Sequence, residues 1–535
     1  MESVGNWLAQ AILAINGWVW SPALVVLCLA AGLYFSFRTR FVQVRRFGEM
    51  FRLLVGASGS KGQSSERPQR KGTGISSFQA FSMALSGRVG TGNIVGVATA
   101  IGFGGPGAIV WMWIIAFLGA GSAFVEATLA QIYKEDHNGQ FRGGPAYYIE
   151  KGLHSPFFGS LFAVLAAVAA GFLLPPIHSN SISVSLGQAF GVPAWIVGIG
   201  VALLIALVVI GGVKRIASVA QVVAPVMAVV YIVLALVVLV VHWRLVPDVF
   251  MQMLRGAVGV NEVGGAILGS TIAWGVKRGI YSNEAGQGTG AIVAAAAKVS
   301  HPVKQGLVQA FSVYIDTLLV CTATAMMILA CKTYNIIDTV QQTVSGPVVT
   351  YLLQNPGAPA GEPSVFYTTR ALGSVVGPRT GNTVISIALF FFAFTTIMAY
   401  YYYAETNLVY LFNRWRRCVY KKHPERLDEL ERADMRFGDD RREKAVIWVL
   451  RLFTIGAVLM GSLLGSGLVW TLGDIGVGVM AWINVVAILL LSPKALRSLK
   501  DYERQKKQGL EPHFDPEALG INDLEYWHQE QQNHD

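Results

Sequence analysis

Long apolar runs recur along almost the whole of this chain. About eleven of them reach roughly 20 residues, which is enough for a helix to cross about 30 Å of hydrocarbon. They lie at 20–37, 76–102, 106–133, 157–186, 194–212, 216–242, 264–288, 303–331, 380–412, 446–468 and 470–492. Hydrophobic residues make up 53% of the chain and charged residues only 14%, whereas an ordinary soluble domain is about 25% charged. The pattern predicts an all-α polytopic membrane protein with about 11 transmembrane helices.

Residues 1–18 differ from these runs because polar residues such as Glu2, Asn6 and Gln10 are spread over an apolar background. They lack the basic start of a signal peptide. We therefore expect segment 1–38 to hold a helix lying in the membrane interface, followed by one extra transmembrane helix.

Lysine and arginine are concentrated in alternate connections. The loop 39–75, the loop 413–445 and the tail 493–535 are rich in both, whereas the connection 332–379 is poor in them. The positive-inside rule then places the N-terminus outside and the C-terminus in the cytoplasm of a multi-pass protein of the cell (inner) membrane. The net charge of +10 is mostly this asymmetry, so we do not expect nucleic-acid binding.

The stretch SGRVGTGNIVG interrupts the second run with glycines and polar residues. Its glycines have the spacing G-x-G-x-x-x-G, which is not the dinucleotide-binding pattern. Gly92 and Gly96 have the spacing of close helix packing, but packing does not explain Arg88, Thr91 and Asn93 in mid-span. A charge at the bilayer centre costs about 2.5–3.5 kcal/mol, and unwound backbone is tolerated there only where it lines a cavity or binds a ligand. The stretch predicts an unwound helix at a ligand site.

The seventh run is interrupted in a similar way by glycines and polar residues. Transporters built from inverted repeats carry interrupted helices in corresponding places of their two halves. If the first run is set aside, 76–242 and 264–492 form two sets of five helices, joined by an external connection at 243–263. The two interrupted runs are then the first helix of each set and point in opposite directions.

Several ordered stretches between Arg88 and Asn407 resemble the alanine or glycine:cation symporter family. They include GRVGTGNIVGVATAI, FRGGPAYYIEKGL, RGIYSNEAGQGTG, DTLLVCTA and AFTTIMAYYYYAETN. The resemblance implies a leucine-transporter-like fold of five-plus-five inverted repeats with one added N-terminal helix. It also implies alternating-access import of a small neutral amino acid, alanine or glycine first, in symport with sodium. No cofactor is expected besides the co-transported ion.

A zwitterionic substrate defines what its site must offer. Its carboxylate needs N–H donors at the end of a half-helix, and the resemblance assigns substrate contacts to Thr91, Gly92 and Asn93. Its ammonium needs carbonyls, which we expect from an unwound segment between Gly269 and Trp274. Trp274 is a candidate apolar wall for the substrate side chain, with an ordinary core aromatic as the alternative.

Sodium needs several hard oxygen ligands. The resemblance assigns them to Thr395 and Thr396 in the ninth run, together with backbone carbonyls near Ser86 and Val89. The alternative is that both hydroxyls bond back to the preceding turn of their own helix.

His178 departs from the family pattern, in which relatives typically carry a glutamine. As a substrate contact it would permit a more polar amino acid, such as serine or glutamine, or a pH-sensitive interaction. The alternative is a histidine at the extracellular helix end, bonded to a backbone carbonyl.

Further charges inside the runs are Glu126, Arg278, Glu284 and Asp316. We expect Arg278 and Glu284, at the cytoplasmic end of the seventh run, to act with Arg88 as gate or structural pairing groups. Because proton relays use such residues, a proton-coupled symporter stays open. A membrane-embedded enzyme is not favoured, since the chain has neither an H-E-x-x-H nor a G-x-S-x-G motif.

Overall fold

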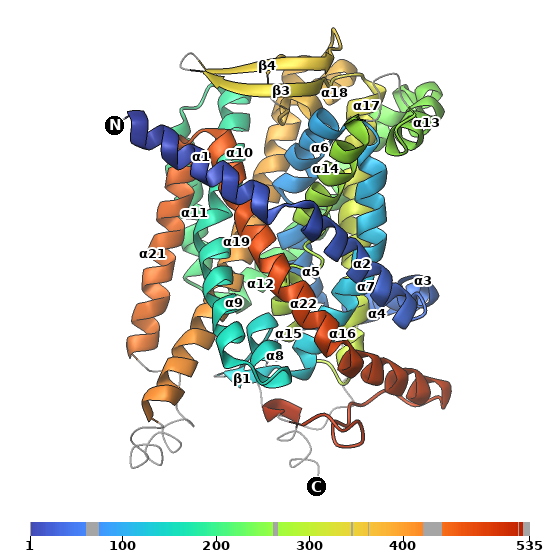
Figure 1. Cartoon of the computed structure of the whole chain (residues 1–535), viewed down its shortest axis with the longest axis vertical. Coiled ribbons are helices and arrows are strands. Elements are labelled where there is room, and N and C mark those ends of the chain that lie inside the picture. Colours follow the sequence, from blue (N-terminus) through green and yellow to red (C-terminus); the bar gives the residue numbers. More distant parts are fainter. Residues whose placement is uncertain are drawn as a thin grey trace.

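The computed structural model of the chain is a helical bundle with two small β-hairpins (Figure 1). It describes residues 2–59, 74–137, 139–260, 266–343, 346–361, 363–420, 441–522 and 524–527. Parts of the predicted connections and tail, at 60–73, 261–265, 421–440 and 528–535, lie outside the described residues.

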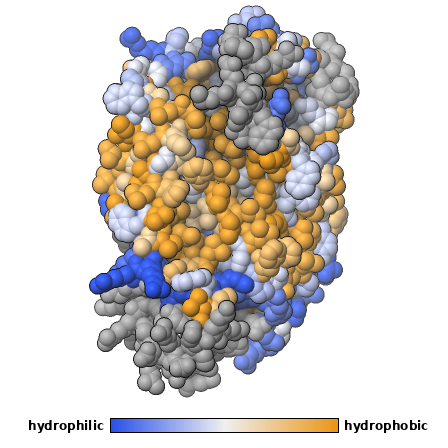
Figure 2. Space-filling view, turned by 60° about the vertical axis from the view of Figure 1, so that its left-hand side comes forward, coloured by the Kyte–Doolittle hydropathy of each residue, from blue (hydrophilic) through white to orange (hydrophobic). Residues whose placement is uncertain are grey.

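Eight helices of the described residues are long and apolar enough to cross a membrane. They are Gln10–Arg38, Ala108–Ile132, Pro156–Phe190, Gly212–Val241, Pro302–Ala330, Pro378–Val419, Arg441–Leu463 and Ser466–Lys507. The other predicted runs are also helical, but one is broken, one has only 16 residues and one carries two cations. Figure 2 shows a broad apolar band across the face in view, with hydrophilic residues toward both ends.

The N-terminal part consists of four helices, of which α1 lies obliquely across the bundle (Figure 1). They are α1 (Glu2–Val19), α2 (Pro22–Arg38), α3 (Val42–Arg45) and α4 (Phe47–Gly59). The Trp482 indole donates a hydrogen bond of 3.0 Å to the Val19 carbonyl, which ties the end of α1 to the bundle. The interfacial position of residues 1–18 stays a prediction.

The first set of predicted spans follows. It comprises α5 (Ser77–Arg88), η1 (Gly92–Gly96), α6 (Val97–Gly104), α7 (Ala108–Ile132), β1 (Glu135–His137), β2 (Gln140–Arg142), α8 (Pro145–Gly152), α9 (Pro156–Val168), η2 (Ala169–Leu173), α10 (Pro175–Phe190), α11 (Ala194–Val209) and α12 (Gly212–Val241). Strands β1 and β2 pair antiparallel, with Glu135 opposite Arg142.

The second set follows two short helices, η3 (Trp243–Leu245) and α13 (Val246–Ala257). It comprises α14 (Ala266–Asn283), α15 (Thr289–Ala295), α16 (Pro302–Val313), η4 (Tyr314–Cys321), α17 (Thr322–Ala330), β3 (Ile336–Thr343), β4 (Gly346–Leu353), α18 (Phe366–Val376), α19 (Pro378–Tyr420), α21 (Arg441–Leu463) and α22 (Ser466–Lys507). The antiparallel hairpin β3–β4 lies at the end of the molecule opposite β1 and α8 (Figure 1).

The predicted break in the second run is confirmed. Helix α5 ends at Arg88 because Val89, with φ −78° and ψ 90°, leaves the helical region. The chain becomes helical again as a π-helical turn from Gly92, and α6 continues it. The break therefore lies within the span, as the polar residues there indicated.

The break in the seventh run lies elsewhere than predicted. Helix α14 is continuous through Gly269 and Trp274, so the expectation of unwound backbone there is wrong. The helix is interrupted instead at 284–288, where Glu284, Gly286 and Gly288 have φ of 56°, 88° and 86°. Two of these residues are glycines, for which the left-handed region carries no steric cost.

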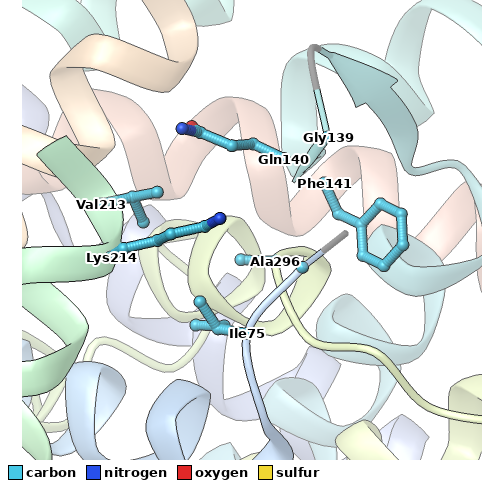
Figure 3. A pocket seen from close by; sticks show the side chains of 8 residues that line it. Ile75, Gly139, Gln140, Phe141, Val213, Lys214 and Ala296 are labelled. Carbon is cyan, nitrogen blue, oxygen red and sulfur yellow. The ribbon is translucent and has the colours of Figure 1, made fainter. Parts of the chain in front are cut away.

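The two broken spans also meet where the first one begins and the second one ends. The amide of Ile75, just before α5, donates to the Ala296 carbonyl at 3.0 Å, and the Lys298 amide donates to the Ile75 carbonyl at 3.0 Å. A small hollow next to this contact is lined by Phe141, Val213 and Lys214 among others (Figure 3). It lies at the end of the bundle, away from the helix breaks.

The described part of the C-terminal tail packs on the bundle. Phe514 and Trp527 are buried, with ring centroids 4.9 Å apart. The Trp527 indole donates to the Gln131 carbonyl at 3.0 Å. Lys151 on α8 lies 3.2 Å from the Glu525 carboxylate; burial opposes its charge, but the surrounding carboxylates raise its pKa above the usual value. The tail covers the end of the molecule that carries the basic loops.

Candidate functional site

The two helix breaks lie against each other in the buried centre of the bundle. A Cβ atom built on Gly92 would lie 3.1 Å from the Tyr281 ring and 3.4 Å from the Ser282 backbone. The missing side chain of Gly92 therefore lets the first broken span pack closely against the last turn of α14, directly before the second break. This buried contact is the central region of the bundle.

His178 belongs to this region. Its Nδ1 atom shares a hydrogen bond of 2.7 Å with Thr91 Oγ1, and both residues are buried. The Tyr400 ring lies 5.2 Å from the imidazole, edge to face. His178 Nε2 and the Tyr281 hydroxyl have no hydrogen-bond partner within the described parts of the chain. The alternative of a backbone carbonyl partner for His178 does not hold, since its partner is the side chain of the first broken span.

Asn93 links the first break to a carboxylate on η4. Its Oδ1 accepts the Gly90 amide at 2.8 Å, and its Nδ2 donates to Asp316 Oδ1 at 2.6 Å. The same carboxylate accepts the Ser282 hydroxyl at 2.9 Å and the Thr317 hydroxyl at 2.7 Å. An amide nitrogen of the first broken span and hydroxyl groups of the seventh span and of η4 thus surround the Asp316 carboxylate.

The structure separates the two threonines of α19. Thr396 Oγ1 donates to the Ser86 carbonyl at 2.8 Å and also lies 2.9 Å from the Phe392 carbonyl. Thr395 Oγ1 lies 3.0 Å from two carbonyls of its own helix and bonds back to the preceding turn. Thr396 and Ser86 are therefore brought together as expected, whereas the Thr395 hydroxyl faces its own backbone.

Arg88 connects three elements beneath the breaks. Its Nε donates to the Asn283 carbonyl at 2.7 Å, its Nη1 donates to Gln309 Oε1 at 3.1 Å and bonds to the Ser312 hydroxyl. The side chain is 1% exposed. The guanidinium thus ties the end of α5 to the ends of α14 and α16.

Trp274 and Arg278 lie on α14, outward of the breaks. Trp274 stacks on Phe103 at 4.7 Å, and at about 1.5 Å per residue it is roughly 10 Å along the helix from Tyr281. It is not brought together with Thr91 or His178. Arg278 forms two hydrogen bonds, of 2.9 and 3.1 Å, with the Asp474 carboxylate of α22.

The expected position of Arg278 and Glu284 at the cytoplasmic end of the span is wrong. Arg278 lies within α14, and Glu284 lies in the break between α14 and α15. The Tyr403 hydroxyl donates to Glu284 Oε2 at 3.1 Å, and the Thr289 side chain also interacts with this carboxylate. Both residues therefore lie inside the span, Arg278 before Tyr281 and Glu284 after it.

Sequence reasoning missed several residues of this region. Asp316 was recognised as an intramembrane charge but was given no role, and Ser282 and Tyr281 were not singled out. Asp474 was also missed, although a lone acidic residue in the apolar eleventh run is a signal that could have identified it. The contacts of Ser282 and Tyr281 carry no sequence signal, because they arise from a helix packing that no local pattern encodes.

Comparison with known proteins decides the class of the molecule. The profile of the sodium:alanine symporter family matches residues 5–423 and 435–516. The chain belongs to the sodium:alanine symporter family. This family consists of membrane transporters, so the protein is a multi-pass transporter and not an enzyme.

Relatives in this symporter family match over nearly the whole chain. A putative sodium/proton-dependent alanine carrier protein of Bacillus subtilis is 49% identical over 98% of each chain. A sodium/proton-dependent alanine carrier protein of Bacillus sp. (strain PS3) is 43% identical over 87% of this chain and 95% of its own. A probable sodium/glutamine symporter of Bacillus subtilis is 39% identical over 96% and 94%. Both central breaks and the Thr396 region lie within the matched residues.

Proposed function

We propose that this protein imports a small neutral amino acid, alanine first and glycine next, by symport with sodium. Membership in the symporter family carries the proposal, and the enclosed polar region where two broken helices meet supports it. Carriage of a more polar amino acid is the second candidate, because one relative is described as a glutamine symporter and His178 presents an unpartnered nitrogen.

We propose a five-plus-five inverted repeat as the framework for alternating access. The first spans of the two sets are both broken and point in opposite directions (Figure 1), as inverted repeats require. The basic loops lie at the end that carries β1–β2 and the tail, which supports a cytoplasmic position for that end and an external position for β3–β4.

The substrate position that we propose is at the first break. The half-helix that begins at Thr91, Gly92 and Asn93 suits a carboxylate. His178 Nε2 and the Tyr281 hydroxyl are buried and have no hydrogen-bond partner among the described residues, and a ligand satisfies such atoms. Because Trp274 lies about 10 Å along α14 from Tyr281, its contact with substrate is confined to states in which the outer half of α14 moves inward.

For sodium we propose the oxygens of Ser86 and Thr396, with Thr395 and the Val89 carbonyl as further ligands after local rearrangement. The hydrogen bond between Thr396 and the Ser86 carbonyl places two hard oxygens together. The oxygens around Asp316 form a second candidate position for a coupled cation, since they include a carboxylate and two hydroxyls.

The test is uptake of radiolabelled alanine, glycine, serine and glutamine into proteoliposomes, with and without an inward sodium gradient. Sodium-driven accumulation against a substrate gradient, with alanine or glycine preferred, is the expected result. One sodium ion entering across about 100 mV supplies roughly 2.3 kcal/mol, enough for accumulation of about fiftyfold. Uptake that only equilibrates substrate across the membrane would refute symport.

Replacing His178 by alanine is expected to raise the KM for alanine by about tenfold, because a hydrogen-bonding group of the site is lost. The smaller side chain also leaves more room, so uptake of glutamine relative to alanine should rise. Competition between the two labelled substrates measures the ratio, and His178→Gln, which keeps a polar group, is the matched variant. An unchanged ratio in both variants would remove His178 from the substrate site.

We propose that the Arg278–Asp474 pair closes the external path. It joins α14 to α22, and the guanidinium lies between Trp274 and Trp470, whose ring centroids are 5.1 and 4.8 Å from it. Gly96 of the first broken span lies directly against the Arg278 side chain. The pair thus covers the enclosed region on the side of β3–β4.

Replacing Arg278 or Asp474 should slow transport, and the effects of the two substitutions should not be independent of each other. Arg278→Ala and Asp474→Ala are each expected to lower the initial uptake rate by about tenfold or more. Arg278→Ala leaves Asp474 with Lys277, whose Nζ lies 2.6 Å away, whereas Asp474→Ala leaves both cations without their shared carboxylate. The double variant should be less impaired than the product of the two single effects. Initial rates for the four proteins form the double-mutant cycle. Strictly multiplicative effects would show that the two side chains act independently.

A further inference from the structure

Glu126 is a buried carboxylate that neither the proposed substrate site nor the proposed sodium positions use. It lies on α7 and is fully buried. Asn484 of α22 donates to its Oε2 at 2.9 Å, while Oε1 has no hydrogen-bond partner of standard geometry in the part of the chain that the structure describes. The same Asn484 amide lies 2.9 Å from the Gly286 carbonyl, so Glu126 lies beside the break between α14 and α15.

The surroundings of Glu126 do not balance its charge. Three buried carboxylates, Glu126, Glu284 and Asp316, interact with the single guanidinium of Arg88. Tyr148 of α8, bonded to Asn484, is the other titratable group that faces Glu126. If all three acids are ionised, Arg88 balances one of the three negative charges and the described residues supply no second cation to them. Such an excess of charge is strongly unfavourable inside a membrane.

Glu126 is not a ligand of either proposed sodium position. Asp316 accepts hydroxyl groups at the second proposed cation position. Glu284, which is two residues after Ser282 in the sequence, accepts the Tyr403 hydroxyl. The Asn484 amide donates to the Glu126 carboxylate, and the backbone amides of Gly286 and Gly288 also interact with it. Its Oε1 accepts no hydrogen bond of standard geometry from the described residues. A proton is the cation that such a site accepts, since it needs only one free carboxylate oxygen.

The position of Glu126 also connects it to the element that must move. A Cβ on Gly288 would lie 2.3 Å from Pro145 of α8 and 3.1 Å from the Asn484 side chain. The break at 284–288 is therefore packed between α8 and α22, next to Glu126 and toward the end that carries the basic loops. Any opening of the site toward that end changes the exposure of this carboxylate.

We propose that Glu126 binds the proton that this transporter couples to amino-acid import when sodium is absent. The inference rests on the proposed symport function. The carboxylate takes up one proton at Oε1 while the central site is open to the outside, and releases it to water on the cytoplasmic side after the site opens inward. One proton moves with each substrate and no other bond changes.

The test compares uptake driven by a proton gradient with uptake driven by a sodium gradient in the same proteoliposomes. Alanine uptake is measured with an inward proton gradient in sodium-free medium, and with an inward sodium gradient at equal pH. In Glu126→Gln the ratio of proton-driven to sodium-driven initial rates is expected to fall by at least about tenfold. Glu126→Asp, which keeps a carboxylate, should largely restore the ratio. Asp248→Asn, an exposed acid on α13, is the control that should leave it unchanged.

Each other outcome contradicts the inference. An unchanged ratio in Glu126→Gln, or a loss of the proton drive in Glu284→Gln alone, would place the proton elsewhere. If Glu126→Gln loses both proton-driven and sodium-driven uptake, the exchange of internal for external alanine is measured at equal pH. Exchange needs no net proton movement, so its loss as well would show that Glu126 is a structural residue. Wild-type protein with sodium-driven but no proton-driven uptake would overturn this inference alone, whereas absence of sodium-driven uptake would overturn the proposed function.

Discussion

Replacing Thr396 by valine is expected to raise the sodium concentration for half-maximal alanine uptake by about tenfold or more. Valine keeps the shape of threonine but lacks the hydroxyl that lies 2.8 Å from the Ser86 carbonyl. Loss of one polar ligand to a charged group costs about 1.5–3 kcal/mol, and about 1.4 kcal/mol is a tenfold change in affinity. Initial uptake rates over a range of sodium concentrations give the result.

Ser386→Ala is the matched control for this experiment. It also removes a buried hydroxyl from α19, but that hydroxyl bonds to Ser185 at 2.7 Å and lies away from the first break. Thr395→Val should have a smaller effect than Thr396→Val, because the Thr395 hydroxyl bonds to its own helix turn. If Thr396→Val leaves the sodium dependence as it is in the wild type, the coupled ion does not use the Ser86 and Thr396 oxygens.

The apolar runs and the first break were predictable because their signals are local. Helix length and apolar composition follow directly from the bilayer, and the polar residues around Thr91 conflict with an intact helix in mid-span. The second break was not predictable to the same accuracy. Gly269 and Gly275 are as permissive as Gly286 and Gly288, so the glycines alone do not indicate which pair interrupts the helix. The glycines at the break differ in their long-range packing, since Gly288 lies against Pro145 and Asn484.

The partners of the site residues depend on the same long-range packing. Thr91 and His178 share a hydrogen bond although they are far apart in the sequence. Nothing local to either residue indicates the other. Family resemblance predicted that Ser86 and Thr396 belong together, and the contact between them agrees with it. The same resemblance gave Thr395 an equal role, which the orientation of its hydroxyl does not support in this state.

Replacing Arg88 by glutamine is expected to destabilise the protein and abolish transport. The guanidinium holds the Asn283 carbonyl and Gln309 together beneath the two breaks, and it is the cation that faces Glu126 and Glu284. Removing one partner from a buried charged network costs about 3–5 kcal/mol, a large part of the stability of a typical protein domain. Thermal unfolding in detergent, together with sodium-driven uptake, measures both consequences.

Arg88→Lys should not rescue either property, because one ammonium cannot reproduce bonds that leave the planar guanidinium in different directions. Arg244→Lys is the control, since Arg244 is exposed on η3 and lies over the Trp243 ring. A stable Arg88→Gln protein without transport would limit Arg88 to the transport cycle. A stable and active one would show that the two breaks hold together without this cross-link, and that the carboxylates around it are neutralised by other means. In that event the protons or sodium ions bound at Glu126, Glu284 and Asp316 would have to carry the whole compensating charge.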